Sequence, residues 1–156
     1  MTYYITEKFK NKHLAGGYLA INAGNMEQFP LVYTENQQPL ISLSQIMLDL
    51  NKQFNEVSNK FTKLLSADLA VVKITKKLEK WHNLEASEFF AEVGKQNKTL
   101  SLTQKSSWLE HFEAEKPKAL AIQSKITQTD TEIDKMVYVL YGLSEEEIAV
   151  VEAVDC

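Results

Sequence analysis

Two stretches of regular apolar spacing limit what this chain can fold into more than any other feature of its sequence. In each stretch, apolar or small residues recur at alternating steps of three and four, the pattern with which one helix packs lengthwise against another. The positions are Leu43, Met47, Leu50, Phe54, Val57, Phe61 and Leu64 in the first stretch, and Ala119, Ile122, Ile126, Thr129, Ile133, Met136 and Leu140 in the second. Neither helix can bury such a stripe alone, so the pattern predicts that the two lie side by side.

Prolines indicate where these two helices begin. Proline is well tolerated in the first turn of a helix, so Pro39 predicts a start near Gln38 and Pro117 predicts that the second helix runs from there to Tyr141. With those bounds we expect Leu50 and Phe61 to pack near Ile126 and Ile133.

The end of the second helix is marked by turn and capping residues. Gly142 supplies the left-handed residue that closes a helix, and Ser144 with Glu147 forms a capping box that opens the next one. The inward positions of this last short helix are Ile148, Val151 and Val154. The chain is therefore predicted to end in a helical hairpin.

Between the long helices the sequence predicts shorter helices rich in aromatic residues. One or two carry Ile74, Leu78 and Trp81, then Phe89, Phe90 and Val93, with Ser87 as a possible cap and an end at Gly94; a further helix, capped by Thr103, carries Trp108, Leu109 and Phe112. These large side chains are expected to fill the space around the helical pair. The alternative is an aromatic box for stacked bases, which normally lies in a basic groove.

The first forty residues have a different character. An amphipathic start is followed by an alternating stretch, Tyr18 to Asn22, that predicts a short strand, and then by a turn at Gly24 and Asn25. We therefore expect a mainly α fold, in which a long antiparallel helical pair with shorter packed helices follows a small α/β remnant. The predicted domains are residues 1–40 and residues 41–156.

Composition limits the class of protein. The chain has 156 residues, 44% of them apolar, which is enough for one ordinary core. It has no run of eighteen apolar residues, and a single cysteine, Cys156, which rules out an intramolecular disulfide. We expect a cytoplasmic protein without a membrane span. The abrupt start at Met1 is typical of a fragment.

Charge is unevenly distributed along the chain. Residues 41–80 carry seven lysines and four acids, whereas residues 81–156 carry seven lysines and fourteen acids. All seventeen basic residues are lysine, so no arginine is present to read guanine with two hydrogen bonds. If the chain meets DNA, it does so weakly and through its first half. The cluster of Lys73, Lys76, Lys77 and Lys80 is either a solvated face or a track for phosphates.

Two segments resemble a known family. The run from Asp130 to Glu152, DTEIDKMVYVLYGLSEEEIAVVE, resembles the closing segment of adenine-specific DNA methyltransferases of restriction-modification systems, including the bifunctional type IIG-like restriction enzymes that also carry a nuclease. The segment from Gly16 to Pro30, GGYLAINAGNMEQFP, is similar to the last part of the target-recognition region in the same family. The two matches come in the family's order, with a helical spacer between them.

The resemblance implies a DNA-recognition and spacer role. Residues 1–40 would be the end of the target-recognition region, and the partners would be double-stranded DNA and the catalytic methyltransferase portion. The candidates for DNA contact are Lys10, Lys12, His13, Asn22 and Asn25, mostly as phosphate contacts that position the protein without specifying sequence. The alternative for this segment is a scaffold, with glycines for close backbone approach and asparagines for turn hydrogen bonds.

The motifs of catalysis are missing from the sequence. It contains neither a glycine-bearing loop for S-adenosylmethionine, the cofactor expected for the parent enzyme, nor the Asn/Asp-Pro-Pro-Phe/Tyr motif that holds a flipped adenine, nor the Pro-Asp of a common nuclease motif. His13, His82 and His111 are not spaced as metal ligands. We therefore expect no catalysis, cofactor or metal in this chain alone. The alternative function is an independent helical module that binds another protein through its apolar seam.

Overall fold

The computed structural model describes residues 32–154, although the side chain of Val154 is not described. The chain divides into two compact units, residues 38–133 and residues 1–37 with 134–156. Within the described residues all regular structure is helical and no strand is present, which confirms the mainly α fold class. The predicted strand at residues 18–22 and the α/β remnant lie outside the described residues. The predicted domain boundary near residue 40 stays a prediction.

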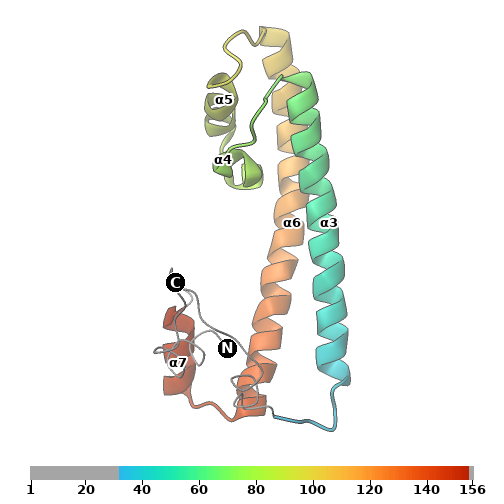
Figure 1. The fold of residues 1–156 in the computed structure, drawn as a ribbon, viewed down its shortest axis with the longest axis vertical. Coiled ribbons are helices and arrows are strands. Elements are labelled where there is room, and N and C mark those ends of the chain that lie inside the picture. Colours follow the sequence, from blue (N-terminus) through green and yellow to red (C-terminus); the bar gives the residue numbers. More distant parts are fainter. Residues whose placement is uncertain (1–31, 155–156) are drawn as a thin grey trace, which may run out of the picture. The chain divides into compact units, whose positions relative to one another are not determined.

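The unit of residues 38–133 is built on two long antiparallel helices. These are α3, Gln38–Asp68, and α6, Leu102–Tyr141, of which residues 102–133 belong to this unit. Between them the chain forms α4, Lys76–Glu79, the 3₁₀ helix η1, Trp81–Asn83, and α5, Ala86–Gly94. The predicted helical pair is confirmed (Figure 1), and the short helices lie against the end where α3 stops and α6 starts. A hydrogen bond from Trp108 Nε1 to the Asp68 carboxylate joins these two helix ends.

The predicted apolar seam of α3 faces inward, with one shift near its end. From Leu43 to Phe61 every predicted position is buried or half-buried. The last one is wrong, because Leu64 is 43% exposed while Leu65 is fully buried. The step from Phe61 to the next inward residue is four instead of three, since Leu65 joins the core that the short helices complete.

The start of α6 differs from the prediction. The helix begins at Leu102, fifteen residues before Pro117, and continues through that proline. Ser101 starts it with a capping box, in which the Gln104 side chain accepts from the Ser101 N–H at 3.1 Å and the Gln104 N–H donates to the Ser101 hydroxyl at 3.2 Å. Thr103 therefore lies inside the helix and is not its cap. Inward residues continue across the exposed proline, so packing overrides its poor helix propensity.

This early start changes the register of the pair. The Phe61 ring stacks on His111, with centroids 5.6 Å apart, and meets Trp108 edge-on at 5.7 Å. The prediction that Phe61 lies near Ile126 and Ile133 is therefore wrong. At 1.5 Å per residue, Ile126 is about 22 Å further along α6 than His111. In this antiparallel register Leu50, eleven residues before Phe61, lies level with residues 119–122 of α6, about one turn before Ile126.

The core of this unit is aromatic and lies where the short helices meet the pair. Trp81, Phe89 and Phe112 are fully or almost fully buried. Phe61 stacks on Trp81 with centroids 3.7 Å apart, and Phe89 stacks on Phe112 at 4.8 Å. The prediction that these aromatic residues fill the space around the helical pair is confirmed. Such ring pairs add about 0.5–1.5 kcal/mol each to the burial of their area.

The short helices are capped by residues other than those predicted. Thr75 caps α4, with its hydroxyl accepting from the Leu78 N–H at 3.3 Å. At the start of α5, Glu88 accepts from the Glu85 N–H at 2.9 Å, so Ser87 is inside the helix and Glu85 precedes it. The predicted end of α5 at Gly94 is confirmed.

The end of α6 and the start of α7, Glu145–Val154, follow the predicted design. Gly142 has φ +64°, the Gly142 N–H donates to the Val139 carbonyl at 3.1 Å, and the Leu143 N–H donates to the Tyr138 carbonyl at 3.0 Å. These two bonds form the Schellman motif that closes a helix. The Ser144–Glu147 capping box is present in both directions, at 2.9 and 3.3 Å. Ile148 and Val151 are half-buried.

Candidate functional site

The candidates for DNA contact drawn from the sequence lie outside the described residues. Lys10, Lys12, His13, Asn22 and Asn25 all precede residue 32, where the description begins. Their role stays a prediction. Within residues 32–154 the candidate features are a pocket, a group of lysines and a buried histidine.

A pocket of about 360 Å³ opens where α3 ends and α6 begins. It is lined by Leu64, Asp68, Thr103, Gln104, Ser107, Trp108 and His111. Two of its polar side chains already serve the local structure, since the Asp68 carboxylate accepts from Trp108 and the Gln104 side chain caps α6. The His111 ring is stacked on Phe61. The Asp68 and Gln104 side chains thus stabilise the two helix ends, and their hydrogen-bonding groups are already used within the fold.

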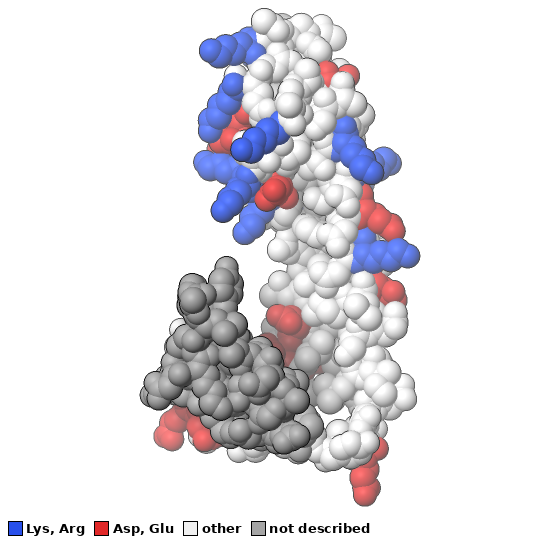
Figure 2. All heavy atoms as spheres, viewed as in Figure 1, with Lys and Arg blue, Asp and Glu red and all other residues white. Residues whose placement is uncertain are grey.

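Six exposed lysines surround α4 and the end of α5. Figure 2 shows blue side chains gathered along this edge of the molecule. We name the group the lysine face, and it consists of Lys73, Lys76, Lys77, Lys80, Lys95 and Lys98. The first four form the cluster noticed in the sequence, and the structure adds the last two. Lys95 and Lys98 are distant in the sequence and are brought near the other four lysines by folding.

Hydrogen bonds between distant segments hold the lysine face in place. The Gln96 side chain accepts from the Lys73 N–H at 2.9 Å and donates to the Lys73 carbonyl at 2.7 Å. One residue later, Asn97 Nδ2 donates to the Leu69 carbonyl at 3.0 Å. The segment before α4 is thus fixed to the segment after α5 by three bonds. The backbone that carries the lysines is ordered by local contacts and does not need a ligand to arrange it.

Two of the four glutamates in residues 73–98 are held in ion pairs. Glu92 is buried, accepts from the Thr75 hydroxyl at 3.3 Å and forms an ion pair with Lys95, which lowers the Glu92 pKa. Glu85 pairs with Lys116 at 3.0 Å, and Lys116 also donates to the Leu84 carbonyl at 2.8 Å. Within the described residues, Lys73, Lys76, Lys77, Lys80 and Lys98 form no ion pair. Residues 73–98 therefore expose uncompensated positive charge in a chain whose net charge is −4.

His82 is a second buried titratable group beside this face. Burial lowers its pKa; a hydrogen bond with the Gln123 side chain opposes the shift, and the charge of Lys80 adds to it. The ring of Phe54 meets the His82 ring edge-on, with centroids 5.1 Å apart. His82 thus joins η1 to both long helices as a neutral core residue, and this side chain has the surroundings of a structural histidine.

The described residues contain neither a metal-binding group nor a membrane-spanning helix. No group of three His, Cys, Asp or Glu side chains in residues 32–154 has the arrangement to hold a metal ion. None of the helices in that range offers an apolar stretch long enough to cross a lipid bilayer.

Comparison with protein families places the helical body in one of them. A family model described as Domain of unknown function (DUF8810) matches residues 34–137, and the chain therefore belongs to this family. The matched range begins just before α3 and ends within α6, so it covers the short helices and most of the antiparallel pair of this chain. The comparison with curated proteins found no match, and neither did the comparison with solved structures.

Proposed function

We propose that this chain is the non-catalytic C-terminal part of an adenine-specific DNA methyltransferase or restriction-modification enzyme, in which its helical body braces the DNA-contacting region. The observation that carries the proposal is the pair of resemblances at residues 16–30 and 130–152, which flank the helical body in the order expected for that family. The parent enzyme would use S-adenosylmethionine and methylate adenine, with catalysis housed in another portion.

The geometry of the described residues fits a brace. α3 has 31 residues and is therefore about 46 Å long, and residues 102–133 of α6 run alongside it for a similar length. Ion pairs, caps and a stacked aromatic core hold one end of this pair rigidly. Such a body would keep the DNA-contacting region at a fixed distance from the rest of the enzyme. It would position that region without taking part in the chemical step.

A methylation assay with the neighbouring reading frame tests this proposal. The genomic sequence directly upstream should encode an Asn-Pro-Pro-Tyr or similar motif in frame. Co-expression of that portion with this chain should raise N6-methyladenine in plasmid DNA well above the level obtained without the chain. Failure to find such a motif, together with methylation that is indifferent to the chain, would overturn the proposal.

A matched pair of substitutions separates bracing from mere presence. Leu65→Asp places a charge in the fully buried core, whereas Leu64→Asp places it on a side chain that is 43% exposed. Methylation should fall with the first and persist with the second. Equal methylation by both variants would contradict a bracing role.

A second function is favoured by one observation. Ile41 and Leu48 lie seven residues apart on one face of α3 and are 54% and 65% exposed, so this face can offer apolar surface to a partner. The chain would then be an independent module that binds another protein or a second copy of itself. Analytical ultracentrifugation distinguishes the two, because an obligate dimer favours the interaction module and a stable monomer favours the brace.

A further inference from the structure

The lysine face is the surface feature that neither the fold nor the proposed brace explains. Residues 73–98 contain six lysines and four glutamates, in a chain that is acidic overall. Two of the glutamates are ion-paired, Glu92 with Lys95 and Glu85 with Lys116. The exposed acids that remain are Glu79 and Glu88, and Glu88 is used in the cap of α5. Positive charge therefore dominates this edge (Figure 2).

We propose that the lysine face binds the phosphate backbone of duplex DNA without reading its sequence. The inference rests on the proposed function, which identifies DNA as the polyanion. It places the DNA contact of the helical body at α4 and the end of α5. Lysine ammonium groups are point charges that contact phosphates, and the chain lacks the arginines that read guanine. The contact would anchor and orient the body along the duplex.

The backbone that carries the lysine face is preorganised by hydrogen bonds, which favours a binding role for these lysines. Gln96 and Asn97 fix the segment before α4 through bonds to the backbone of Lys73 and Leu69. Buried Glu92 holds Thr75 and Lys95 on either side of the same junction. The positions of the lysine Cα atoms are thus set before any partner arrives, which reduces the entropy lost on binding.

A membrane surface fits this face less well than a duplex. Helices that lie on membranes place large apolar residues at the lipid boundary beside their lysines. Here Leu78, Trp81, Phe89 and Val93 are buried in the core, and Phe90 is half-buried against it. Val72 is exposed beside Lys73, but a single valine provides little apolar area for insertion. Anionic vesicles are therefore a control and not the expected partner.

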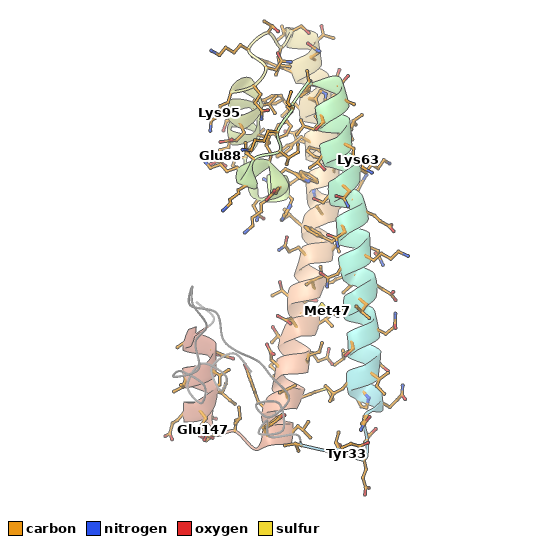
Figure 3. All side chains as sticks on the ribbon, viewed as in Figure 1. Tyr33, Met47, Lys63, Glu88, Lys95 and Glu147 are labelled. Carbon is orange, nitrogen blue, oxygen red and sulfur yellow. The ribbon has the colours of Figure 1, made fainter. Side chains whose placement is uncertain are left out.

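Two charge-matched variants of the full chain test the proposal. The face variant combines Lys73→Gln, Lys76→Gln, Lys77→Gln and Lys80→Gln. The control variant combines Lys52→Gln, Lys60→Gln, Lys63→Gln and Lys125→Gln, which are all exposed and lie on α3 and α6. Figure 3 shows Lys63 and Lys95 on opposite edges of this unit. Both variants lose the same net charge, and circular dichroism verifies that each keeps its helices.

Binding to a fluorescent duplex of arbitrary sequence is measured by anisotropy from 20 to 200 mM NaCl. The face variant should bind roughly 100-fold more weakly at 50 mM salt and lower the slope of log K against log salt by about 3.6, since each phosphate contact contributes about 0.9. The control variant should change affinity by less than about threefold and leave the slope nearly intact.

Three results would overturn the inference. The first is an equal loss in the two variants, which would mean that only net charge matters. The second is the absence of duplex binding even at 20 mM salt. The third is binding to phosphatidylserine vesicles with none to DNA. None of these results touches the methylation assay, so the lysine face can fail while the proposed brace stands, and the reverse is also true.

Discussion

The two ends of the helical pair in residues 38–133 are packed very differently. At one end Phe61 and Leu65 of α3 meet Trp108 and Phe112 of α6 beneath the short helices, and all four are almost fully buried. At the other end the described residues of this unit add no short helices to the pair, and most seam residues, such as Leu43 and Met47, are half-buried. A third layer of helices therefore turns a marginal two-helix contact into a core. Most of the stability should reside at the aromatic end.

The largest expected effect comes from emptying that aromatic end. Phe89→Ala removes a fully buried ring that touches Phe61, Trp108 and Phe112, and should lower the free energy of unfolding by about 3–5 kcal/mol. Leu50→Ala, in the two-helix half, should lower it by about 2 kcal/mol because the cavity lies near solvent. Urea denaturation followed by circular dichroism measures both. Equal losses of unfolding free energy would contradict the claim that the aromatic end contributes more stability than the two-helix end.

The register of the seam is tested by two adjacent leucines. Leu65→Ala should lower the free energy of unfolding by about 2–5 kcal/mol, since its side chain is fully buried. Leu64→Ala should lower it by less than about 1 kcal/mol, because nearly half of its surface already meets water. The same urea titration applies. The opposite ranking would mean that Leu64, the residue predicted from the sequence, faces the core in place of Leu65.

Two glycines at helix ends offer a smaller contrast. Gly142 has φ +64°, so Gly142→Ala should lower the stability of its helix end by about 1 kcal/mol through strain alone, because nothing lies within 4 Å of an added Cβ. Gly94 also has open space but no positive φ, and Gly94→Ala should raise stability by up to about 1 kcal/mol. Thermal unfolding of the two variants would show opposite shifts. Shifts of the same sign would argue against the left-handed helix end.

The smallest effect is a pH dependence that comes from His82. Its folded-state pKa lies below the ordinary 6.5, so between these values the unfolded chain binds a proton that the folded chain does not. Stability should therefore be unaffected by His82 above pH 6.5 and should fall as the pH drops through that value.

A substitution of His82 separates its contribution from that of the acids. The pKa of Glu92 is lowered, first by its hydrogen bond with Lys95, and the pKa of Glu115 is lowered likewise by Lys118, so their contributions are lost only below the ordinary 4.5. His82→Gln should flatten the stability profile just below pH 6.5 and leave the acidic part unchanged. A profile that keeps its full slope there in His82→Gln would assign the effect to another group.

Local patterns in the sequence predicted much of the fold. The three-and-four spacing located both seams, and the helix stop at Gly142 with the box at Ser144 and Glu147 was found because these signals depend on adjacent residues. Pro117 predicted a late start of α6, whereas the Ser101–Gln104 capping box, which is also a local sequence signal, marks the observed start. The shift from Leu64 to Leu65 depends on helices packed from elsewhere in the chain.

The candidate site depended more on contacts between distant segments. The cluster from Lys73 to Lys80 was visible as a run of charge, but its union with Lys95 and Lys98 requires the bonds from Gln96 to Lys73 and from Asn97 to Leu69. Such bonds leave no local pattern. The neutral burial of His82 against Phe54 and Gln123 is equally non-local.

Amide hydrogen exchange of the full chain tests most directly whether the aromatic end anchors the helical pair. We expect the slowest exchange in residues 61–69 and 108–119, where opening requires loss of the whole core. Residues 40–50 and 122–133 should exchange about 100-fold faster, equivalent to roughly 2.8 kcal/mol less protection. Uniform protection along both long helices, or slower exchange in the two-helix half, would contradict this expectation.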